Sequence, residues 1–227
     1  MNIKILKIND FSYANDLASL HAKNINGKLS NIGVEFLSKI YQTFLQDRNI
    51  RIWILFHNEK AVGFLCGCIR NKEIYKKFLF KNFSFLIFLF LRNILNLSFI
   101  KNAYGLIILF LTPKNFFSGN SELLSIAISK NFRNKYYGKK LIRKLDFYLR
   151  KKNKKEYIVK VEFNNRKAIN FYLSNKFKHM FKTNYPLFDI LYLKKKTIIH
   201  NLFHVSFLDI KRKYFHHTIY NNFLFLF

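Results

Sequence analysis

The sequence predicts an α/β domain in which helices pack against a central sheet. Two observations support this fold class. The chain has 227 residues, half of them hydrophobic, so it can bury one large core, and intrinsic disorder is excluded as its main state. From residue 122 onward, strand-like and helix-like patterns alternate regularly. This order ends after Lys196, where an aromatic and basic tail over residues 196–227 begins.

The first part of the chain predicts a strand, two helices and a hairpin. Hydrophobic residues alternate with lysines near the N-terminus, then recur at helical spacing in two segments. Two further apolar runs flank a short polar turn, which is typical of a β-hairpin. The expected elements are a strand over 2–8, a helix carrying Leu17, Leu20 and His21, a helix from Val34 to Leu45, and strands over 51–56 and 61–69.

Residues 71–112 form an unusually apolar insertion. Its two most hydrophobic stretches, Phe83 to Leu91 and Leu106 to Leu111, are separated by polar residues. Neither stretch reaches the roughly 20 apolar residues that a membrane-spanning helix needs. We therefore expect buried or interfacial helices here. A helix that lies on a bilayer with a basic fringe stays open as the alternative.

The second part of the chain predicts the alternating elements of the α/β layer. Each helix carries apolar residues on one face, and each strand is a short apolar run. The expected order is a strand from Glu122 to Ile128, a basic loop over 129–138, a helix over 139–152, a strand over 157–163, a helix over 166–174, and strands over 177–181 and 187–193.

The net charge is strongly positive, but it does not identify a partner. Forty Lys and Arg residues against 12 acidic ones give +28, which would suit nucleic acid, a phosphorylated ligand or a lipid surface. The lysines are spread along the whole chain, and an AT-rich genome would favour the same composition. A nucleic-acid partner therefore has no support beyond charge and is not expected.

Cysteine usage and the N-terminal sequence indicate the cytoplasm. Cys66 and Cys68 are separated only by Gly67, too close in sequence for ordinary disulfide geometry. Two cysteines cannot staple a secreted domain of this length, so a reducing compartment is expected. The first residues also lack the pattern of a signal peptide.

The segment from residue 122 to 142 combines a strand, a basic loop and a helix. Backbone N–H groups at a helix N-terminus attract phosphate, and Gly138 would let the backbone approach a ligand closely. The segment therefore predicts a pyrophosphate site, with a solvated basic loop as the alternative. The basic side chains concerned are Arg133, Lys135, Lys139 and Lys140.

A second segment, residues 161–177, places Asn165, Ala168 and Tyr172 on a strand and the following helix. Together the two segments resemble the GNAT superfamily of N-acetyltransferases. That family combines a strand of pattern L-x-x-I-A-V with a loop R/Q-x-x-G-x-G/A, and later V-x-x-x-N-x-x-A-x-x-x-Y-x-x-x-G-F. Tyr136 and Lys176 stand where these patterns have glycines. If Tyr136 takes positive φ, we expect a strained loop.

The resemblance covers residues 1–195 and implies one GNAT-like domain. Its sheet would be mixed and mostly antiparallel, of about six to seven strands, with helices on both faces. Residues 71–112 would be a helical insertion between the hairpin and the cofactor strand.

The resemblance also implies a site for acetyl-CoA. Backbone groups of the central strand would pair with the pantetheine arm, and the loop would hold the pyrophosphate. Asn165 would support the cofactor side. The implied strand residues are Ile126, Ala127 and Ile128, and the implied loop residues are Arg133, Asn134, Lys135, Tyr136, Tyr137, Gly138 and Lys139.

Two residues are candidates for proton transfer. Glu122 would act as a general base through a water, and Tyr172 would donate a proton to the departing thiolate. The alternatives are a solvated carboxylate paired with a lysine and a core aromatic beside Phe171. No metal is expected, since His200 and His204 have no third ligand at useful spacing.

The resemblance thus implies an acetyl-CoA-dependent N-acetyltransferase. Its acceptor would be a small-molecule amine, preferably an amino sugar or a sugar nucleotide, and a protein N-terminus or lysine is the alternative acceptor. The alternative is a weakly catalytic or non-catalytic acyl-CoA-binding module attached to a membrane or a protein partner. Peripheral membrane contact through residues 83–111 or the tail stays open, and so does a homodimer.

Overall fold

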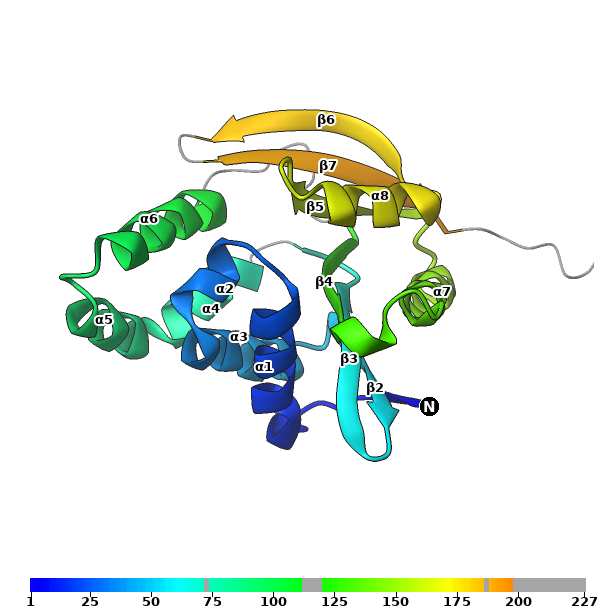
Figure 1. The fold of residues 1–227 in the computed structure, drawn as a ribbon, viewed down its shortest axis with the longest axis horizontal. Coiled ribbons are helices and arrows are strands. Elements are labelled where there is room, and N and C mark those ends of the chain that lie inside the picture. Colours follow the sequence, from blue (N-terminus) through cyan, green and yellow to red (C-terminus); the bar gives the residue numbers. More distant parts are fainter. Residues whose placement is uncertain (72–73, 112–119, 186–187, 198–227) are drawn as a thin grey trace, which may run out of the picture. The chain divides into compact units, whose positions relative to one another are not determined.

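The computed structural model describes residues 1–71, 74–111, 120–185 and 188–197, the side chains of 108–111, 185 and 188 excepted. Residues Met1–Thr197 form one compact unit. Its centre is a seven-stranded sheet in the order β1-β2-β3-β4-β5-β7-β6 (Figure 1). The strands are β1 (Asn2–Ile5), β2 (Ile50–His57), β3 (Lys60–Cys68), β4 (Glu122–Ile128), β5 (Glu156–Glu162), β6 (Lys178–Tyr185) and β7 (Phe188–Lys196).

All neighbouring strands in this sheet are antiparallel except β4 and β5, which run parallel. The predicted mixed, mostly antiparallel sheet is therefore confirmed. The described helices are α1 (Ala14–Asn24), α2 (Lys28–Ile32), α3 (Val34–Gln46), α4 (Ile74–Lys81), α5 (Phe83–Arg92), α6 (Leu97–Leu111), α7 (Tyr137–Lys151) and α8 (Arg166–Ser174), with short 3-10 turns η1 (Phe11–Tyr13) and η2 (Lys130–Phe132).

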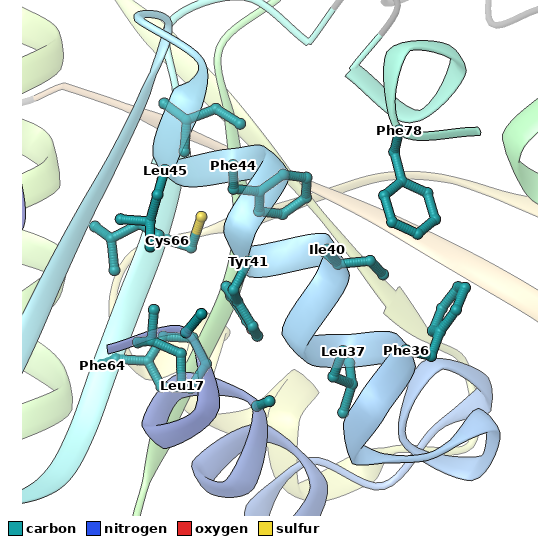
Figure 2. Packing of buried hydrophobic residues seen from close by; sticks show 14 of the residues in the cluster. Leu17, Phe36, Leu37, Ile40, Tyr41, Phe44, Leu45, Phe64, Cys66 and Phe78 are labelled. Carbon is teal, nitrogen blue, oxygen red and sulfur yellow. The ribbon is translucent and has the colours of Figure 1, made fainter. Parts of the chain in front are cut away.

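One face of the sheet is covered by α1, α3 and the insertion helices. Apolar residues at helical spacing on α3 pack on β3 residues such as Phe64 and Cys66 (Figure 2). The rings of Phe36 on α3 and Phe78 on α4 meet edge to face, 5.3 Å apart at their centroids. The insertion is therefore anchored in the same core as α1 and α3.

The opposite face is covered by α7 and α8. The residues of α7 that face the sheet are buried, and they pack with Trp53 and Leu65 from the hairpin. Gly67 of β3 allows this approach, because a Cβ there would lie 2.6 Å from a methyl carbon of Leu145. Helices thus lie on both faces, as the family resemblance implied.

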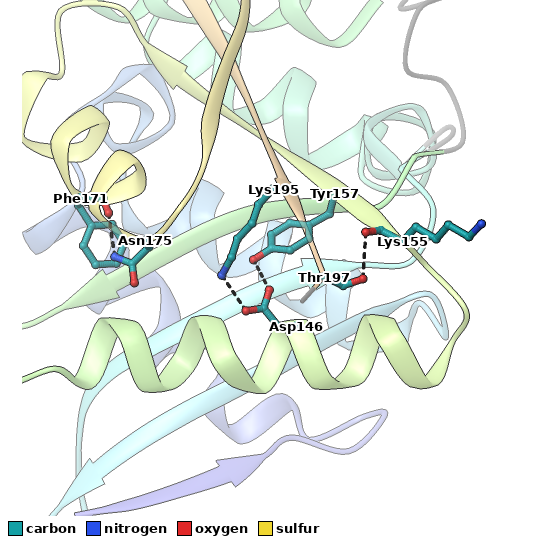
Figure 3. A network of polar contacts seen from close by, with 7 residues as sticks. All are labelled: Asp146, Lys155, Tyr157, Phe171, Asn175, Lys195 and Thr197. Carbon is teal, nitrogen blue, oxygen red and sulfur yellow. Dashed lines mark hydrogen bonds and ion pairs between the residues drawn. The ribbon is translucent and has the colours of Figure 1, made fainter. Parts of the chain in front are cut away.

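A polar network ties α7 to β5 and β7 (Figure 3). The carboxylate of Asp146 on α7 accepts hydrogen bonds from the Tyr157 hydroxyl at 2.8 Å and from Nζ of Lys195 at 2.7 Å. Lys195 is buried, so this ion pair lies in a partly dehydrated layer. The helix is consequently fixed by polar contacts as well as by its apolar face.

Most of the predicted elements match the structure within a few residues. Strand β4 and helix α8 have the predicted bounds, whereas β6 is longer than expected. Helix α2 was missed: it is a five-residue helix whose N-cap and C-cap are Gly27 and Gly33, and apolar periodicity does not reveal so short an element. Both cysteines are free and buried. The predicted tail lies outside the described residues from 198 onward.

Candidate active site

The two parallel strands at the centre of the sheet pair only where β4 begins. Glu122 lies opposite Ile158 and Leu123 opposite Val159, and no pairing between β4 and β5 follows. From Leu124 onward, β4 pairs with β3 alone. The sheet therefore opens between β4 and β5, and the backbone groups on one edge of β4 are left without a strand partner.

A bulge in β4 sets which groups point into this opening. The register slips at Leu124, since Cys66 lies opposite Ser125 and Gly67 opposite Leu123. Beyond β4, the N–H of Ser129 donates to the carbonyl of Val62 on the β3 side. Because successive N–H groups of a strand point to opposite sides, those of Ile126 and Ile128 point to the open edge. Ala127, predicted as their companion, points its N–H toward β3.

The loop after β4 keeps a left-handed backbone at two positions. Asn134 has φ +61° and Tyr136 has φ +58°. Asparagine tolerates this conformation, but a tyrosine there is strained by about 1–2 kcal/mol. The expected strain at Tyr136 is therefore present. The loop has the left-handed backbone that glycine favours, although a tyrosine stands at this position.

Helix α7 begins next to this loop with free backbone donors. The N–H of Lys140 is the first to bond, to the carbonyl of Tyr136, and no side chain caps the helix. Among the described residues, the N–H groups of Tyr137, Gly138 and Lys139 have no backbone acceptor. Free donors at the positive end of a helix dipole attract anions, and the pyrophosphate site predicted here stays a prediction.

Gly138 has a packing role that the sequence did not reveal. A Cβ at this position would lie 2.9 Å from two ring carbons of Phe171 on α8. The glycine therefore lets the start of α7 pack against α8. The close approach to a ligand, which the sequence analysis expected at Gly138, stays a prediction.

The basic side chains of the loop differ in what they contact. The Nε of Arg133 donates to the carbonyl of Ile128 at 2.9 Å, and its Nη2 reaches the backbone and side-chain oxygens of Asn24 at 3.3 and 3.2 Å. Arg133 thus ties the loop to the end of α1. Lys135, Lys139 and Lys140 are exposed and add positive charge around the helix start.

The connection between α1 and α2 reaches both sides of the opening. Asn24 holds Arg133 after β4, and the backbone N–H of Lys28 donates to Oε1 of Glu162, the last residue of β5, at 3.3 Å. The sequence analysis did not single out Glu162. The contact joins residues 134 positions apart, so no local pattern could have revealed it.

Glu122 is buried at the point where β4 and β5 pair. Its side chain is 2% exposed. Nδ2 of Asn71 and Nζ of Lys160 both donate to its Oε2, each at 2.7 Å. The carboxylate therefore forms a buried ion pair with Lys160. The alternative was also a carboxylate paired with a lysine, but a solvated one. Its part in proton transfer stays a prediction.

Tyr172 lies in the core formed by α7, α8 and the sheet. Its ring meets those of Phe171 and Phe177 at centroid distances of 5.5 and 5.2 Å. Burial raises the pKa of its hydroxyl well above the ordinary value. Its role as proton donor stays a prediction.

Asn165 caps helix α8. Its side-chain oxygen accepts a hydrogen bond from the N–H of Ala168 at 3.1 Å. This contact gives the residue a structural task at the end of the opening. A contact with the cofactor stays a prediction and would have to use the amide nitrogen.

A buried polar chain reaches β4 from the other face of the sheet. Nδ1 of His21 lies 2.7 Å from the Tyr41 hydroxyl, which lies 3.1 Å from Oγ of Ser125. Burial lowers the pKa of His21 to about 4, so the ring is neutral at pH 7. Sequence analysis missed Tyr41 and Ser125, because the contact between them spans 84 positions and each looks like an ordinary core residue alone.

Among the residues with described side chains, no group of three or more His, Cys, Asp or Glu is placed to hold a metal ion. His200 and His204 lie outside those residues.

Comparisons with known proteins identify relatives of this fold. The family model described as "Acetyltransferase (GNAT) family" matches residues 28–177. The search of curated proteins gave no match.

Several solved structures share the fold at low sequence identity. The ribosomal-protein-S18-alanine N-acetyltransferase of Escherichia coli aligns with TM-score 0.53 and 15% identity, over 88% of this chain and 97% of that one. An N-acetyltransferase of Staphylococcus aureus Mu50 gives 0.55 and 15%, over 87% and 98%. The PaiA N-acetyltransferase of Thermoplasma acidophilum, in complex with coenzyme A, gives 0.51 and 17%, over 86% and 99%.

Proposed function

Because this chain belongs to the GNAT family of acetyltransferases, we propose that it transfers an acetyl group from acetyl-CoA to a primary amine. The observation that carries the proposal is the unpaired edge of β4 beside the uncapped start of α7. An extended amide-containing arm fits such an edge, and a pyrophosphate fits such a helix start. The two features are adjacent in the chain, as one ligand with both chemical parts requires.

The open edge would bind the donor as an additional strand. N–H groups of Ile126 and Ile128 would pair with amide oxygens of the pantetheine arm, and the N–H of Ile128 would face the thioester carbonyl. When the amine nitrogen attacks that carbon, negative charge develops on the oxygen, and a fixed backbone donor stabilises it. Tyr137, Gly138 and Lys139 would hold the pyrophosphate through their N–H groups.

Proton movement would use Glu122 and Tyr172. The amine loses a proton as the C–N bond forms, and a water leading to Glu122 would accept it. The C–S bond then breaks and leaves a thiolate. An ordinary tyrosine is protonated at neutral pH, and burial raises the pKa of the Tyr172 hydroxyl further. It could therefore donate a hydrogen bond to the departing sulfur.

We propose a small amine, preferably an amino sugar or a sugar nucleotide, as the acceptor. Such an amine loses its proton more easily than a lysine side chain, and the positive net charge suits an anionic acceptor. The carboxylate of Glu162 at the end of β5 offers a partner for the ammonium group before attack. The segment joining α1 and α2 lies beside it, so its residues would contact the acceptor first.

A second candidate function is a weakly catalytic acyl-CoA-binding module. The strained backbone at Tyr136 favours it, because a strained loop could hold the donor with its thioester misplaced for attack. The two candidates differ in thiol release and not in binding, so one experiment separates them.

The test is a titration of the purified protein with acetyl-CoA, followed by calorimetry and thermal shift at fixed salt. Saturable stabilisation, about 2.7 kcal/mol at one hundred times Kd, with competition by free coenzyme A, would support the donor site. No binding up to millimolar acetyl-CoA would overturn it. Thiol release with a panel of amines would then support the transferase, whereas binding without release for any amine would support the module.

A further inference from the structure

We propose that the outward face of α5 and the turn between α5 and α6 bind an anionic lipid surface. This inference concerns a different part of the molecule from the acetyl-CoA site, and it does not depend on the proposed function. For the argument, the apolar patch is defined as the exposed apolar residues between Phe80 and Ile107.

The exposed large hydrophobic side chains of the described residues are concentrated in the apolar patch. More than half of the exposed large hydrophobic side chains among the described residues lie in this segment. Leu95 is 94% exposed, Phe80 83% and Leu97 82%. Scattered exposed apolar residues are normal, but a contiguous group of this kind marks an interaction surface. An open hollow lined by residues 91–97 lies at the turn within the same patch.

Helix α5 is apolar on the side that faces solvent as well as on the side that faces the core. Its inner side is anchored through Leu89, which is 3% exposed and packs in the core with Phe36 and Phe78. A surface helix normally has a polar outer side. Before Arg92, the exposed residues of α5 are Phe83, Ser84, Ile87, Phe88, Phe90 and Leu91.

The charged residues within the segment that carries the patch have one sign. Between Ile74 and Leu111 the chain has five basic residues and no acidic one. Two of the five are offset by ion pairs, Lys77 with Asp47 and Arg92 with Glu35. The exposed Lys76, Lys81 and Lys101 remain beside the apolar side chains. A surface that combines apolar depth with negative charge complements this arrangement, and an anionic bilayer has both.

The patch fits a surface contact and not a membrane span. Among the described residues, no helix is long and apolar enough to cross a bilayer. Helix α5 has 10 residues and is anchored in the core by Leu89, and α6 has 15 residues and is anchored by Phe99 and Leu106. The outer residues of α5 and the turn would therefore enter only the interfacial layer.

The experiment is sedimentation of the full chain with vesicles of phosphatidylcholine alone or of phosphatidylcholine mixed with phosphatidylglycerol. The test variant is Leu95→Glu with Leu97→Glu, which alters two exposed side chains of the patch. The matched control is Ile5→Glu with Phe147→Glu, because both residues are also exposed and the net charge changes equally. Circular dichroism of each variant checks that the fold is retained.

We expect binding to the mixed vesicles only, weakened by added salt. Each leucine replacement should reduce the partition coefficient about tenfold or more, whereas the control pair should keep most of the binding because it changes only the net charge. Replacing Lys101 by Gln should reduce it about fivefold.

Three outcomes would overturn the proposal. They are no binding of the parent protein to either vesicle, equal binding of the parent and the Leu95/Leu97 variant, and equal loss in the control variant. If the parent instead forms a dimer that the Leu95/Leu97 variant does not form, and vesicles are not bound, the patch belongs to an interface with a second copy.

Discussion

At the scale of single residues, two left-handed backbone positions hold another residue where the family pattern has glycine. They are Tyr136, with φ +58°, and Lys176, with φ +69°. Each costs about 1–2 kcal/mol relative to a relaxed backbone. The surrounding loop and helix therefore impose the left-handed conformation on Tyr136 and Lys176, whose own backbone preferences oppose it.

Replacing Tyr136 by Gly should stabilise the protein by about 1 kcal/mol, because the strain is removed. The measurement is urea unfolding followed by circular dichroism. The control is Tyr137→Gly at the neighbouring helical position, which should cost about 0.5–1 kcal/mol. Equal effects of the two variants would show that φ at Tyr136 is not strained in solution.

His21 should make the stability depend on pH below neutrality. Burial lowers its pKa to about 4 in the folded state, against 6.5 as the ordinary value. The unfolded chain therefore binds the extra proton first, so stability is lost as the pH falls from about 6.5 toward 4. At pH 4.5 the loss from this residue should be roughly 2–3 kcal/mol.

The His21→Gln variant should lose less stability than the parent between pH 7 and 4.5, since glutamine does not titrate. Urea unfolding at the two pH values gives the comparison, and carboxylates contribute equally to both proteins. Parallel losses in the parent and the variant would mean that His21 titrates normally.

Glu122→Gln should lower turnover at neutral pH more than it weakens acetyl-CoA binding, if the carboxylate receives the proton. The same change leaves Lys160 buried without its counter-charge, which costs stability by about 3–5 kcal/mol. Adding Lys160→Met removes the unpaired charge and should recover stability without recovering turnover. Turnover equal to that of the parent in either variant would remove Glu122 from the mechanism.

At the scale of elements, helix α7 has different tasks along its length. Its middle is fixed to the sheet through Asp146, and its first turn presents free N–H groups and exposed lysines. The contacts in the middle of α7 fix the direction of the helix axis. They therefore also fix the position of the N–H groups at its first turn, where a ligand would bind.

Lys139→Glu should weaken coenzyme A binding about tenfold, since a negative charge replaces a positive one beside the proposed pyrophosphate. Lys152→Glu makes the same change at the opposite end of α7 and should leave the affinity nearly unaltered. Calorimetric titration of both variants gives the comparison. A similar decrease in both would indicate a general effect of net charge and would place the pyrophosphate elsewhere.

At the scale of the whole molecule, the proposed donor site depends on the point where two strands of one sheet stop pairing. The edge of β4 can accept a ligand only while β5 is held apart, through its own pairing with β7 and through the α1–α2 connection. Donor binding would close this unpaired edge and should therefore change the protection of particular backbone groups.

Acetyl-CoA should slow hydrogen exchange of the N–H groups of Ile126 and Ile128, which point to the open edge. The N–H of Ala127 serves as an internal control, because it points to β3 and should be protected with or without the ligand. Nuclear magnetic resonance measures the exchange rate of each of these three N–H groups separately. Unchanged exchange at Ile126 and Ile128 with saturating acetyl-CoA would show that the donor does not pair with β4.

The sequence alone determined the order of nearly all elements and the position of the loop before α7. These features depend on local periodicity, on a strand leading into a helix, and on basic residues near a helix start, all of which act over a few residues. The tertiary structure decided three other features. They are the packing contact of Gly138, the buried ion pair of Glu122 with Lys160, and the hydrogen-bonded side chains from His21 to Ser125. Each joins residues from separate elements, and only the folded sheet and its two helical layers bring those residues into contact.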